Sequence, residues 1–116
     1  MTVKECYDSI GADYSGVVAR MCGEERVLKF LPKFINDPTY GDLIKGFEEE
    51  NWELAFRAAH TMKGLCSNFG FSKLQKSSSD LCELLRPGIY NESAPAQLEI
   101  VKADYNETIK AISSLD

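Results

Sequence analysis

The chain has 116 residues, 44% of them hydrophobic, and a net charge of −5 with a pI near 4.9. This length predicts a single domain, residues 1–116, with one modest core. The acidic balance argues against nucleic acid as a partner, because binding to the phosphate backbone needs a concentrated basic surface. No run approaches the ~20 apolar residues of a membrane span and the start lacks the apolar core of a signal peptide, so we expect a cytoplasmic protein without a membrane partner.

The N-terminal segment predicts two short helices. Thr2 and Glu5 fit a capping box that opens the first helix. Asp13 is placed to cap a second helix that runs through Met21, and Gly23 is placed to end it. Both helices are too short to form a bundle alone, so we expect them to pack across one end of the longer helices that follow.

Two longer helical segments come next, from Glu24 to about Ile35 and from Pro38 to about Glu50. Asp37 suits the N-cap of the second segment, with Pro38 at its first position. Apolar residues recur at helical spacing in both segments. Those expected in the core are Val27, Leu28, Phe30, Leu31, Phe34, Ile35, Leu43, Ile44 and Phe47.

The segment from Trp52 to about Phe69 predicts the helix that carries the candidate site. At about 100° per residue, an apolar arc of roughly 60° to either side centres on Met62. Its other members are Ala55, Ala58, Ala59, Leu65, Cys66 and Phe69. The only histidine of the chain, His60, falls about 160° from Met62 on the opposite face. That face also holds Glu53, Arg57, Gly64 and Ser67, so the imidazole should be exposed to water.

Gly64 stands one turn after His60, inside a segment that otherwise favours helix. Glycine there costs roughly 1 kcal/mol relative to alanine, and its missing side chain leaves the imidazole uncovered on that side. Lys63 and Arg57 flank the histidine, and their long side chains can reach an anion held at the ring. An exposed imidazole, an open approach and adjacent cations predict a place for a phosphoryl group.

The C-terminal half predicts two more helices. Gly70 suits the end of the site helix, Ser72 and Gln75 fit a second capping box, and the helix that follows should stop at Arg86. A last helix starts with Ser93 or Ala94 as its cap and carries a long apolar seam. The core residues expected from the two helices are Leu74, Ser78, Leu81, Leu84, Leu85, Leu98, Val101, Tyr105, Ile109 and Ile112.

No segment alternates with period two over a useful length, so we predict an all-α fold. Short loops force neighbouring helices to run antiparallel, which gives an up-down-up-down antiparallel four-helix bundle with short additional N-terminal helices. No exposed heptad seam demands a dimer, and we expect a monomer.

Other chemistries fit the residues less well. A hydrolase built on His60 would need a cleft and an oxyanion hole, which a convex helix face does not offer. No glycine-rich phosphate loop precedes a helix, so we expect no autonomous kinase activity. Four cysteines show no Cys-x-x-Cys spacing, and we interpret them as reduced structural residues, with a metal or redox module as the less favoured alternative. They are Cys6, Cys22, Cys66 and Cys82.

The residues around His60 resemble the signature of histidine-containing phosphotransfer (HPt) domains, the modules of multistep phosphorelays. The match consists of Ala59-His60-Thr61-Met62-Lys63-Gly64 followed by Asn68-Phe69-Gly70. Flanking patterns extend it over nearly the whole chain: Asp13-Tyr14, Gly23-Glu24-Glu25 and Asn51-Trp52. Met62 stands where leucine is commoner in the family. Cys82 falls where family members often place a polar residue near the phosphorylated ring. Because cysteine differs from those polar residues, we do not assign Cys82 a role at the ring.

The resemblance implies that His60 is the phosphoacceptor, through Nε2, that Lys63 helps to neutralise the phosphoryl group and that Gly64 leaves room for it. The expected partner is a response-regulator receiver domain, with that of a hybrid histidine kinase among the candidates. The protein itself would be a phosphocarrier of two-component signal transduction with no cofactor or metal, because the Mg²⁺ belongs to the receiver. Expected docking residues are Phe56, Arg57 and Ser67, with a helix-seam role equally open for Phe56. The alternative is a non-catalytic helical adaptor that binds receivers without phosphotransfer.

Overall fold

The structure, a computed structural model, describes residues 1–115 and contains helices but no strand in that range. The helices are α1 (Val3–Ser9), α2 (Tyr14–Met21), α3 (Glu24–Ile35), α4 (Thr39–Glu48), α5 (Trp52–Phe69), α6 (Ser72–Leu85) and α7 (Ala94–Ser113). The prediction of an all-α fold is therefore confirmed. None of these helices is both long enough and apolar enough to cross a bilayer.

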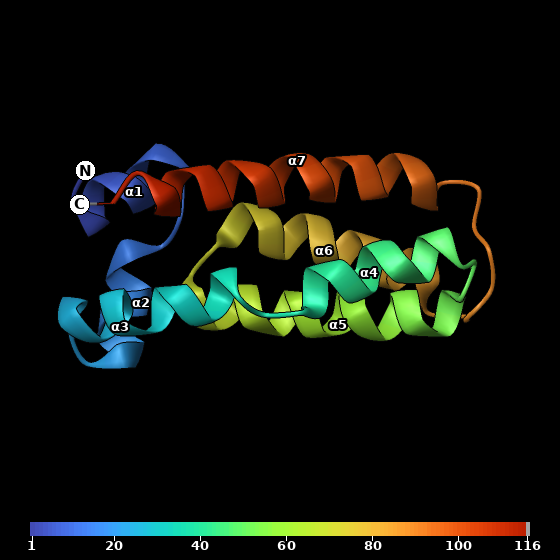
Figure 1. The fold of residues 1–116 in the computed structure, drawn as a ribbon, viewed down its shortest axis with the longest axis horizontal. Helices are drawn as coiled ribbons and strands as arrows, with labels where there is room; N and C mark the ends of the chain where they lie inside the picture. The colour runs from blue at the N-terminus through green and yellow to red at the C-terminus, as the bar shows by residue number, and fades with distance from the viewer. Residues whose placement is uncertain (116) are drawn as a thin grey trace.

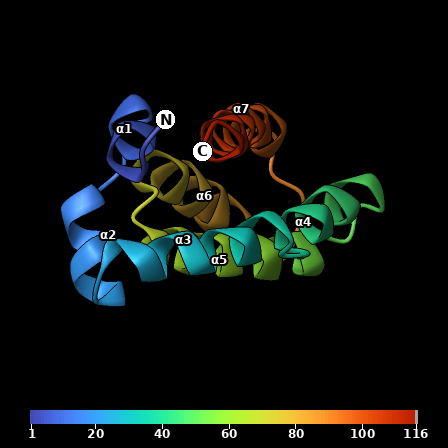
Figure 2. The ribbon, with the colours of Figure 1, turned by 60° about the vertical axis from the view of Figure 1, so that its left-hand side comes forward.

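The long helices form an antiparallel bundle. α5 packs against both α4 and α6, and α6 also packs against α7. α3 and α4 lie end to end along α5 and together make the remaining arm of the bundle (Figure 1; Figure 2). The chain thus runs up, down, up and down, as predicted, in a body 41 Å long and about half as wide. α1 and α2 lie at one end, where α1 contacts α7.

Most of the predicted helix ends are confirmed. Thr2 and Glu5 form the capping box of α1. The Asp13 carboxylate accepts a hydrogen bond from the Gly16 N–H at 3.0 Å. Gly70 ends α5 in the left-handed region, with φ of 75°. Glycine has no side chain to clash in that conformation, which explains its place there.

Three predicted capping residues are wrong. At the start of α4 the N-cap is Pro38 and not Asp37, although the Asp37 carboxylate accepts a hydrogen bond from the Thr39 N–H at 2.8 Å. Ser72 does not cap α6, because Phe71 occupies the N-cap position and α6 has no side-chain cap. Phe71 is held there by burial, since its ring packs against Phe34 and Phe69. α2 does end at Met21 as predicted, but Cys22 rather than Gly23 takes the left-handed C-cap conformation, with φ of 63°.

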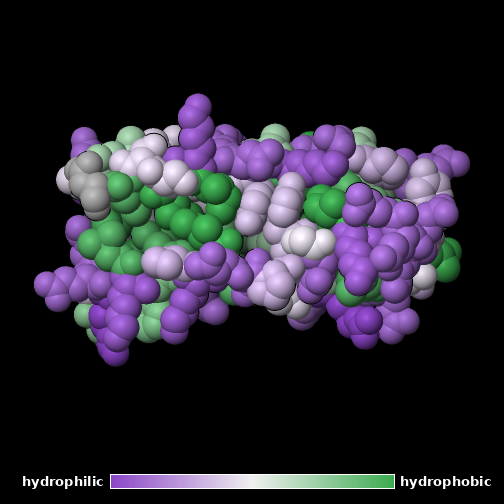
Figure 3. All heavy atoms as spheres, viewed as in Figure 1, coloured by the Kyte–Doolittle hydropathy of each residue, from purple (hydrophilic) through white to green (hydrophobic). Residues whose placement is uncertain are grey.

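The predicted core is mostly confirmed, with two corrections on α3. Leu28 and Ile35 are 43% and 39% exposed. They fail to reach the core because α3 lies at the edge of the bundle and buries only Val27, Leu31 and Phe34. Figure 3 shows hydrophobic atoms on the surface at the same end of the molecule, which holds α3 and the C-terminal half of α7.

An aromatic cluster holds the C-terminal end of α5 in place. Rings of Tyr7, Phe34, Phe69 and Phe71 pack against one another with centroids 4.9 to 5.7 Å apart. The Tyr7 hydroxyl donates to the Phe69 carbonyl oxygen at 2.8 Å. A buried hydroxyl with a partner avoids the cost of an unsatisfied polar group. The site helix is therefore fixed at one end by contacts from α1, α3 and the α5–α6 turn.

Candidate functional site

α5 presents two faces of opposite character. Ala55, Ala58, Ala59, Met62, Cys66 and Phe69 are buried, whereas Glu53, Arg57, His60, Gly64 and Ser67 are exposed. The predicted assignment of faces holds except at Leu65, which is only half-buried. The Asn51 side chain caps the start of the helix by accepting from the Leu54 N–H at 3.1 Å. The imidazole of His60 is thus exposed on a helix that is capped at its start.

A shallow hollow of about 310 Å³ lies beside His60. It is lined by Phe56, Arg57, His60, Thr61 and Arg86. The ring centroids of Phe56 and His60 are 6.2 Å apart. Phe56 is half-buried, so it belongs partly to the helix seam and partly to the surface. The structure thus brings two of the three predicted docking residues, Phe56 and Arg57, next to the histidine.

Arg86 is the residue at this hollow that sequence reasoning missed. It follows α6 directly, and its guanidinium lies over the Phe56 ring, 5.3 Å from the centroid. Two hydrogen bonds to the Glu83 carboxylate, at 2.8 and 3.1 Å, hold it in place. From the sequence alone, Arg86-Pro87-Gly88 predicts only where the preceding helix ends. An arginine at the end of the neighbouring helix is a signal that becomes visible once the antiparallel pairing of α5 and α6 is known.

Positive charge reaches the site from both helices. The hydrogen bonds and charge of Arg86 lower the pKa of Glu83, and Lys63 adds a smaller effect in the same direction. Burial raises the pKa of the Cys82 thiol, and the charges of Arg86 and Lys63 oppose that rise. The charge of Lys63 acts on both Cys82 and Glu83 of α6, so this half-buried lysine lies on the side of His60 that faces α6. Arg57 is exposed, with a loose contact to Glu53 at 3.8 Å.

Gly64 is open to solvent. A Cβ built on it would meet no heavy atom within 4 Å. Its backbone is not in the left-handed region, so neither strain nor close packing requires glycine here. Ser67, the third predicted docking residue, is exposed on the same face but does not line the hollow. The side of His60 toward the C-terminus of α5 is consequently free for the approach of another molecule.

None of the four cysteines is among the residues that line this hollow. All four are free thiols, and Cys6, Cys66 and Cys82 are buried while Cys22 is exposed. Burial raises the pKa of the Cys66 thiol to about 12. A buried thiol that stays protonated is a poor nucleophile and a poor metal ligand. Within residues 1–115, no three Cys, His, Asp or Glu side chains are grouped so that they could hold a metal ion.

The arrangement can support nucleophilic attack by an imidazole on a group brought by another molecule. The imidazole is exposed and stands on a convex face, and cations on both sides can neutralise an anion. The open hollow does not enclose a substrate, so a partner must supply the remaining walls of the site. Such a division fits a group transfer between two proteins better than a reaction on a small molecule.

Comparison with known proteins places the chain in a family. The family model for the Hpt domain matches residues 36–114, which is more than half of the chain and covers α4 to α7. No curated protein and no solved structure matches the chain significantly. The matched range includes His60 and the helices that pack around α5. The chain belongs to the Hpt domain family, the histidine phosphotransfer domains of phosphorelays.

Proposed function

We propose that His60 accepts a phosphoryl group from the aspartyl phosphate of a receiver domain and passes it to another receiver. The observation that carries this proposal is the exposed imidazole of His60 on a convex face, with open space at Gly64 and cations from α5 and α6 beside it. Domains of this family work with receiver domains in phosphorelays. A single copy of the chain presents the whole face, so the proposal requires no dimer.

The transfer of the phosphoryl group needs no reacting group from this chain other than His60. In the tautomer that carries its proton on Nδ1, the Nε2 lone pair of His60 attacks phosphorus. An N–P bond forms while the P–O bond to the receiver's aspartate breaks, and the carboxylate leaves with the electron pair. A neutral imidazole is a nucleophile near neutral pH and requires no separate base. The Mg²⁺ that neutralises the travelling group would come from the receiver.

The cations of this chain would act on the phosphoryl group once it has arrived. Lys63 approaches from the α6 side, and Arg57 and Arg86 line the hollow beside the ring. Hydrogen bonds between a cation and phosphate oxygens are about twice as strong as neutral ones. Phe56 gives the hollow an apolar wall against which a receiver loop can pack, and exposed Ser67 extends the docking surface.

The test is transfer of labelled phosphate from phosphorylated receivers to the wild-type chain and to His60→Gln. We expect label on the wild type alone, stable to base and lost in acid, as for a phosphohistidine. The variant should stay folded, because substitutions at exposed sites change stability by about ±0.5 kcal/mol. Label on His60→Gln would refute the assignment of the site. Receivers that bind the wild type without transferring label would favour the adaptor.

A further inference from the structure

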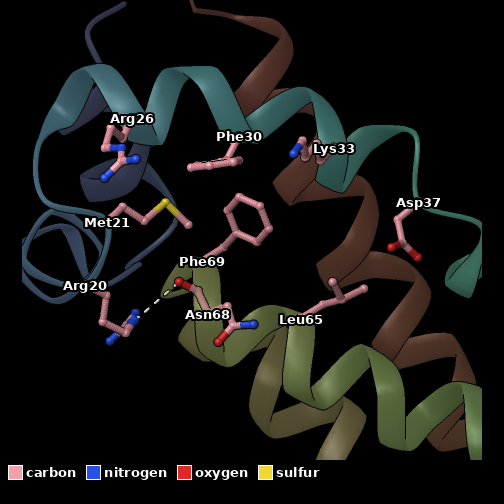
Figure 4. A pocket seen from close by; sticks show the side chains of 9 residues that line it. All are labelled: Arg20, Met21, Arg26, Phe30, Lys33, Asp37, Leu65, Asn68 and Phe69. Atoms are coloured by element: carbon pink, nitrogen blue, oxygen red, sulfur yellow. Dashed lines mark hydrogen bonds between the residues drawn. The ribbon is translucent and has the colours of Figure 1, made fainter.

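The N-terminal helices provide hydrogen-bond donors to the end of α5. The Arg20 Nε of α2 donates to the Asn68 carbonyl oxygen at 3.3 Å, as the dashed line in Figure 4 shows. The Tyr7 hydroxyl of α1 donates to the next carbonyl oxygen, that of Phe69, at 2.8 Å. The last carbonyl groups of an α-helix have no partner within the helix. α1 and α2 therefore supply two of the donors that the end of α5 lacks.

The turn between α1 and α2 contacts the same end of α5. The Asp13 N–H donates to the Gly70 carbonyl oxygen at 2.8 Å. A Cβ on Gly70 would lie 2.8 Å from the Asp13 carbonyl oxygen, so the two backbones leave no room for a side chain. Three successive residues at the end of the site helix are thus held by residues 1–22, which we call the N-terminal clamp.

The clamp also forms one wall of a hollow of about 690 Å³ between α2, α3 and α5. Figure 4 shows Arg20 and Met21 of α2 opposite Asn68 and Phe69 of α5. Leu65, one turn earlier on α5, lines the same hollow and is only half-buried. Because the hollow separates part of α2 from α5, the hydrogen bond from Arg20 to Asn68 is an important part of the contact between the two helices.

The clamp has the features of a unit that can open by itself. α2 buries one of its eight residues, whereas α6 buries six of fourteen. Both clamp helices are shorter than the ~12–15 residues at which an isolated helix becomes marginally stable, so they depend on the bundle. Gly11 and Gly23 lie before and after α2 with φ of 63° and 132°, and a Cβ on either would meet no heavy atom within 4 Å. Segments with few buried residues open at a lower free energy than the core.

Opening of the clamp would leave the end of α5 without these caps. The carbonyl groups of Asn68 and Phe69 would lose their donors, and the aromatic cluster would lose the Tyr7 ring. Ser67 and Asn68 are exposed in this last turn, on the side of His60 that is open to another molecule. Fraying would therefore disorder part of the surface proposed to meet the receiver, while His60, more than two turns away, stays in the helix.

We propose, on the basis of the proposed function above, that the N-terminal clamp controls the affinity of receivers for the face of His60 through the last turn of α5. The closed clamp keeps that part of the docking surface ordered, and the open clamp leaves it disordered. When only a fraction of the molecules is closed, the apparent dissociation constant rises by the inverse of that fraction. The chemical step is unaffected, because no clamp residue lines the hollow beside His60.

The experiment uses Tyr7, because its side chain is completely buried and cannot contact a receiver. Tyr7→Phe removes the hydroxyl that donates to Phe69 and keeps the ring, and Tyr7→Ala removes both. Tyr14→Phe is the control for the first variant, because it removes a hydroxyl of α2 that donates to Glu24 and not to α5. Tyr40→Ala is the control for the second, because it removes a ring that stacks between α4 and α7, away from the clamp.

Two quantities are measured on each protein. Hydrogen exchange of backbone amides gives the free energy of clamp opening, and titration with a purified, unphosphorylated receiver domain gives the affinity. In the wild type, amides of α1, α2 and the last turn of α5 should exchange with one common opening free energy, below that of the centre of α6. Tyr7→Ala should bind the receiver at least about tenfold more weakly, by the inverse of its closed fraction.

The remaining expectations separate affinity from chemistry and from general stability. Tyr7→Phe should lose affinity only as far as its closed fraction falls. At saturating phosphorylated receiver, the rate of label transfer to His60 should be that of the wild type in both Tyr7 variants. Both controls should bind the receiver as the wild type does, although Tyr40→Ala lowers the free energy of unfolding.

Clamp amides that exchange only through global unfolding would overturn the inference. Wild-type affinity in a Tyr7→Ala variant whose clamp is open would overturn it too, as would an equal loss of affinity in Tyr40→Ala. If Tyr7→Ala does not fold, Tyr7→Phe and Arg20→Met provide the test, since their loss of affinity must still match the measured closed fraction. The proposed function fails on different data, because a wild type that binds receivers but accepts no label contradicts the role of His60 alone.

Discussion

The Arg86 guanidinium stacks on the Phe56 ring, 5.3 Å from its centroid, and so joins the end of α6 to the second turn of α5 beside His60. The two side chains come from parts of the sequence thirty positions apart. Cation–π contacts at exposed sites contribute about 0.5–1 kcal/mol. The contact is therefore weak as a source of stability, and its main consequence is to fix a positive charge next to the imidazole.

The first prediction concerns that charge. Arg86→Ala should lower the rate of phosphoryl transfer about tenfold or more, because hydrogen bonds to charged groups contribute about 1.5–3 kcal/mol and each 1.36 kcal/mol is a factor of ten. Stability should fall by less than about 1 kcal/mol, since the lost ion pair with Glu83 is exposed. Single-turnover transfer from a phosphorylated receiver measures the first effect and urea unfolding the second.

Glu83→Gln is the matched control for Arg86. It removes the ion-pair partner but keeps the guanidinium and its stacking on Phe56. Transfer should stay within about threefold of the wild type, because the cation near the phosphoryl group is retained. Equal losses in Arg86→Ala and Glu83→Gln would mean that the pair matters only for the local structure.

The second prediction uses the open space at Gly64. Gly64→Ala should stabilise α5 by about 0.5–1 kcal/mol, because glycine is a poor helix former and the new Cβ meets nothing within 4 Å. Gly64→Gln should keep most of that gain yet block transfer, since its longer side chain occupies the approach to His60. Thermal unfolding and label transfer should therefore change in opposite directions.

Gly41 provides the control for Gly64. It lies in α4, is exposed, and a Cβ there also meets nothing within 4 Å. Gly41→Gln should stabilise the fold by a similar amount and leave transfer unchanged. Loss of transfer in both variants would trace the effect to the helices themselves and not to access at His60.

The third prediction concerns the contact that positions α5 against α4. A Cβ on Gly46 would lie 2.8 Å from the backbone nitrogen of Ala55, closer than atoms can approach. Gly46→Ala should therefore destabilise the fold by about 1–3 kcal/mol, as overpacking does, despite the better helix propensity of alanine. Urea unfolding measures the change, and Gly41→Ala, expected to stabilise, is the comparison in the same helix. A neutral Gly46→Ala would show that α4 and α5 can separate without cost.

Much of the fold could be predicted because the apolar spacing in α4 to α7 repeats with the helical period. The capping residues Thr2, Asp13 and Asn51 act through hydrogen bonds to residues three positions away, so the sequence contains both partners. Leu28 and Ile35 look identical to core residues by spacing alone. Their exposure depends on how far α3 lies from the bundle axis, which is a property of the whole assembly.

The candidate site divides in the same way. His60, Gly64 and Arg57 lie on one helix, so their common face follows from helical geometry. Arg86 and the hollow between α2, α3 and α5 depend on contacts between helices. At Ser72 the local sequence pattern misled the prediction. The residues fit a capping box, but the burial of Phe71 places Phe71 and not Ser72 at the N-cap of α6. Local signals identified His60 as the proposed nucleophile, and tertiary packing determined which other residues surround it.

The fourth prediction is that one thiol reacts in the native protein. Cys22 is exposed, whereas Cys6, Cys66 and Cys82 are buried, with raised pKa values that follow mainly from burial. A thiol reagent at neutral pH should therefore modify Cys22 alone, and all four should react in denaturant. Cys22→Ser should abolish the native reaction. Rapid modification of a second cysteine would contradict the packing around α5 and α6.

The last prediction is a loss of stability in alkali that depends on Cys66. Burial raises the pKa of this thiol from its ordinary 9.0 to about 12. Below pH 9 the thiol is protonated in both the folded and the unfolded chain, so its full contribution to the free energy of unfolding is present. Between about pH 9 and 12 only the unfolded chain ionises, and the free energy of unfolding should fall by up to about 1.4 kcal/mol per pH unit. Urea unfolding of the wild type and of Cys66→Ala at several pH values measures this, and the stability gap between them should narrow as the pH rises. Parallel curves would mean that the thiol ionises equally in both states, contrary to its complete burial beneath His60's helix.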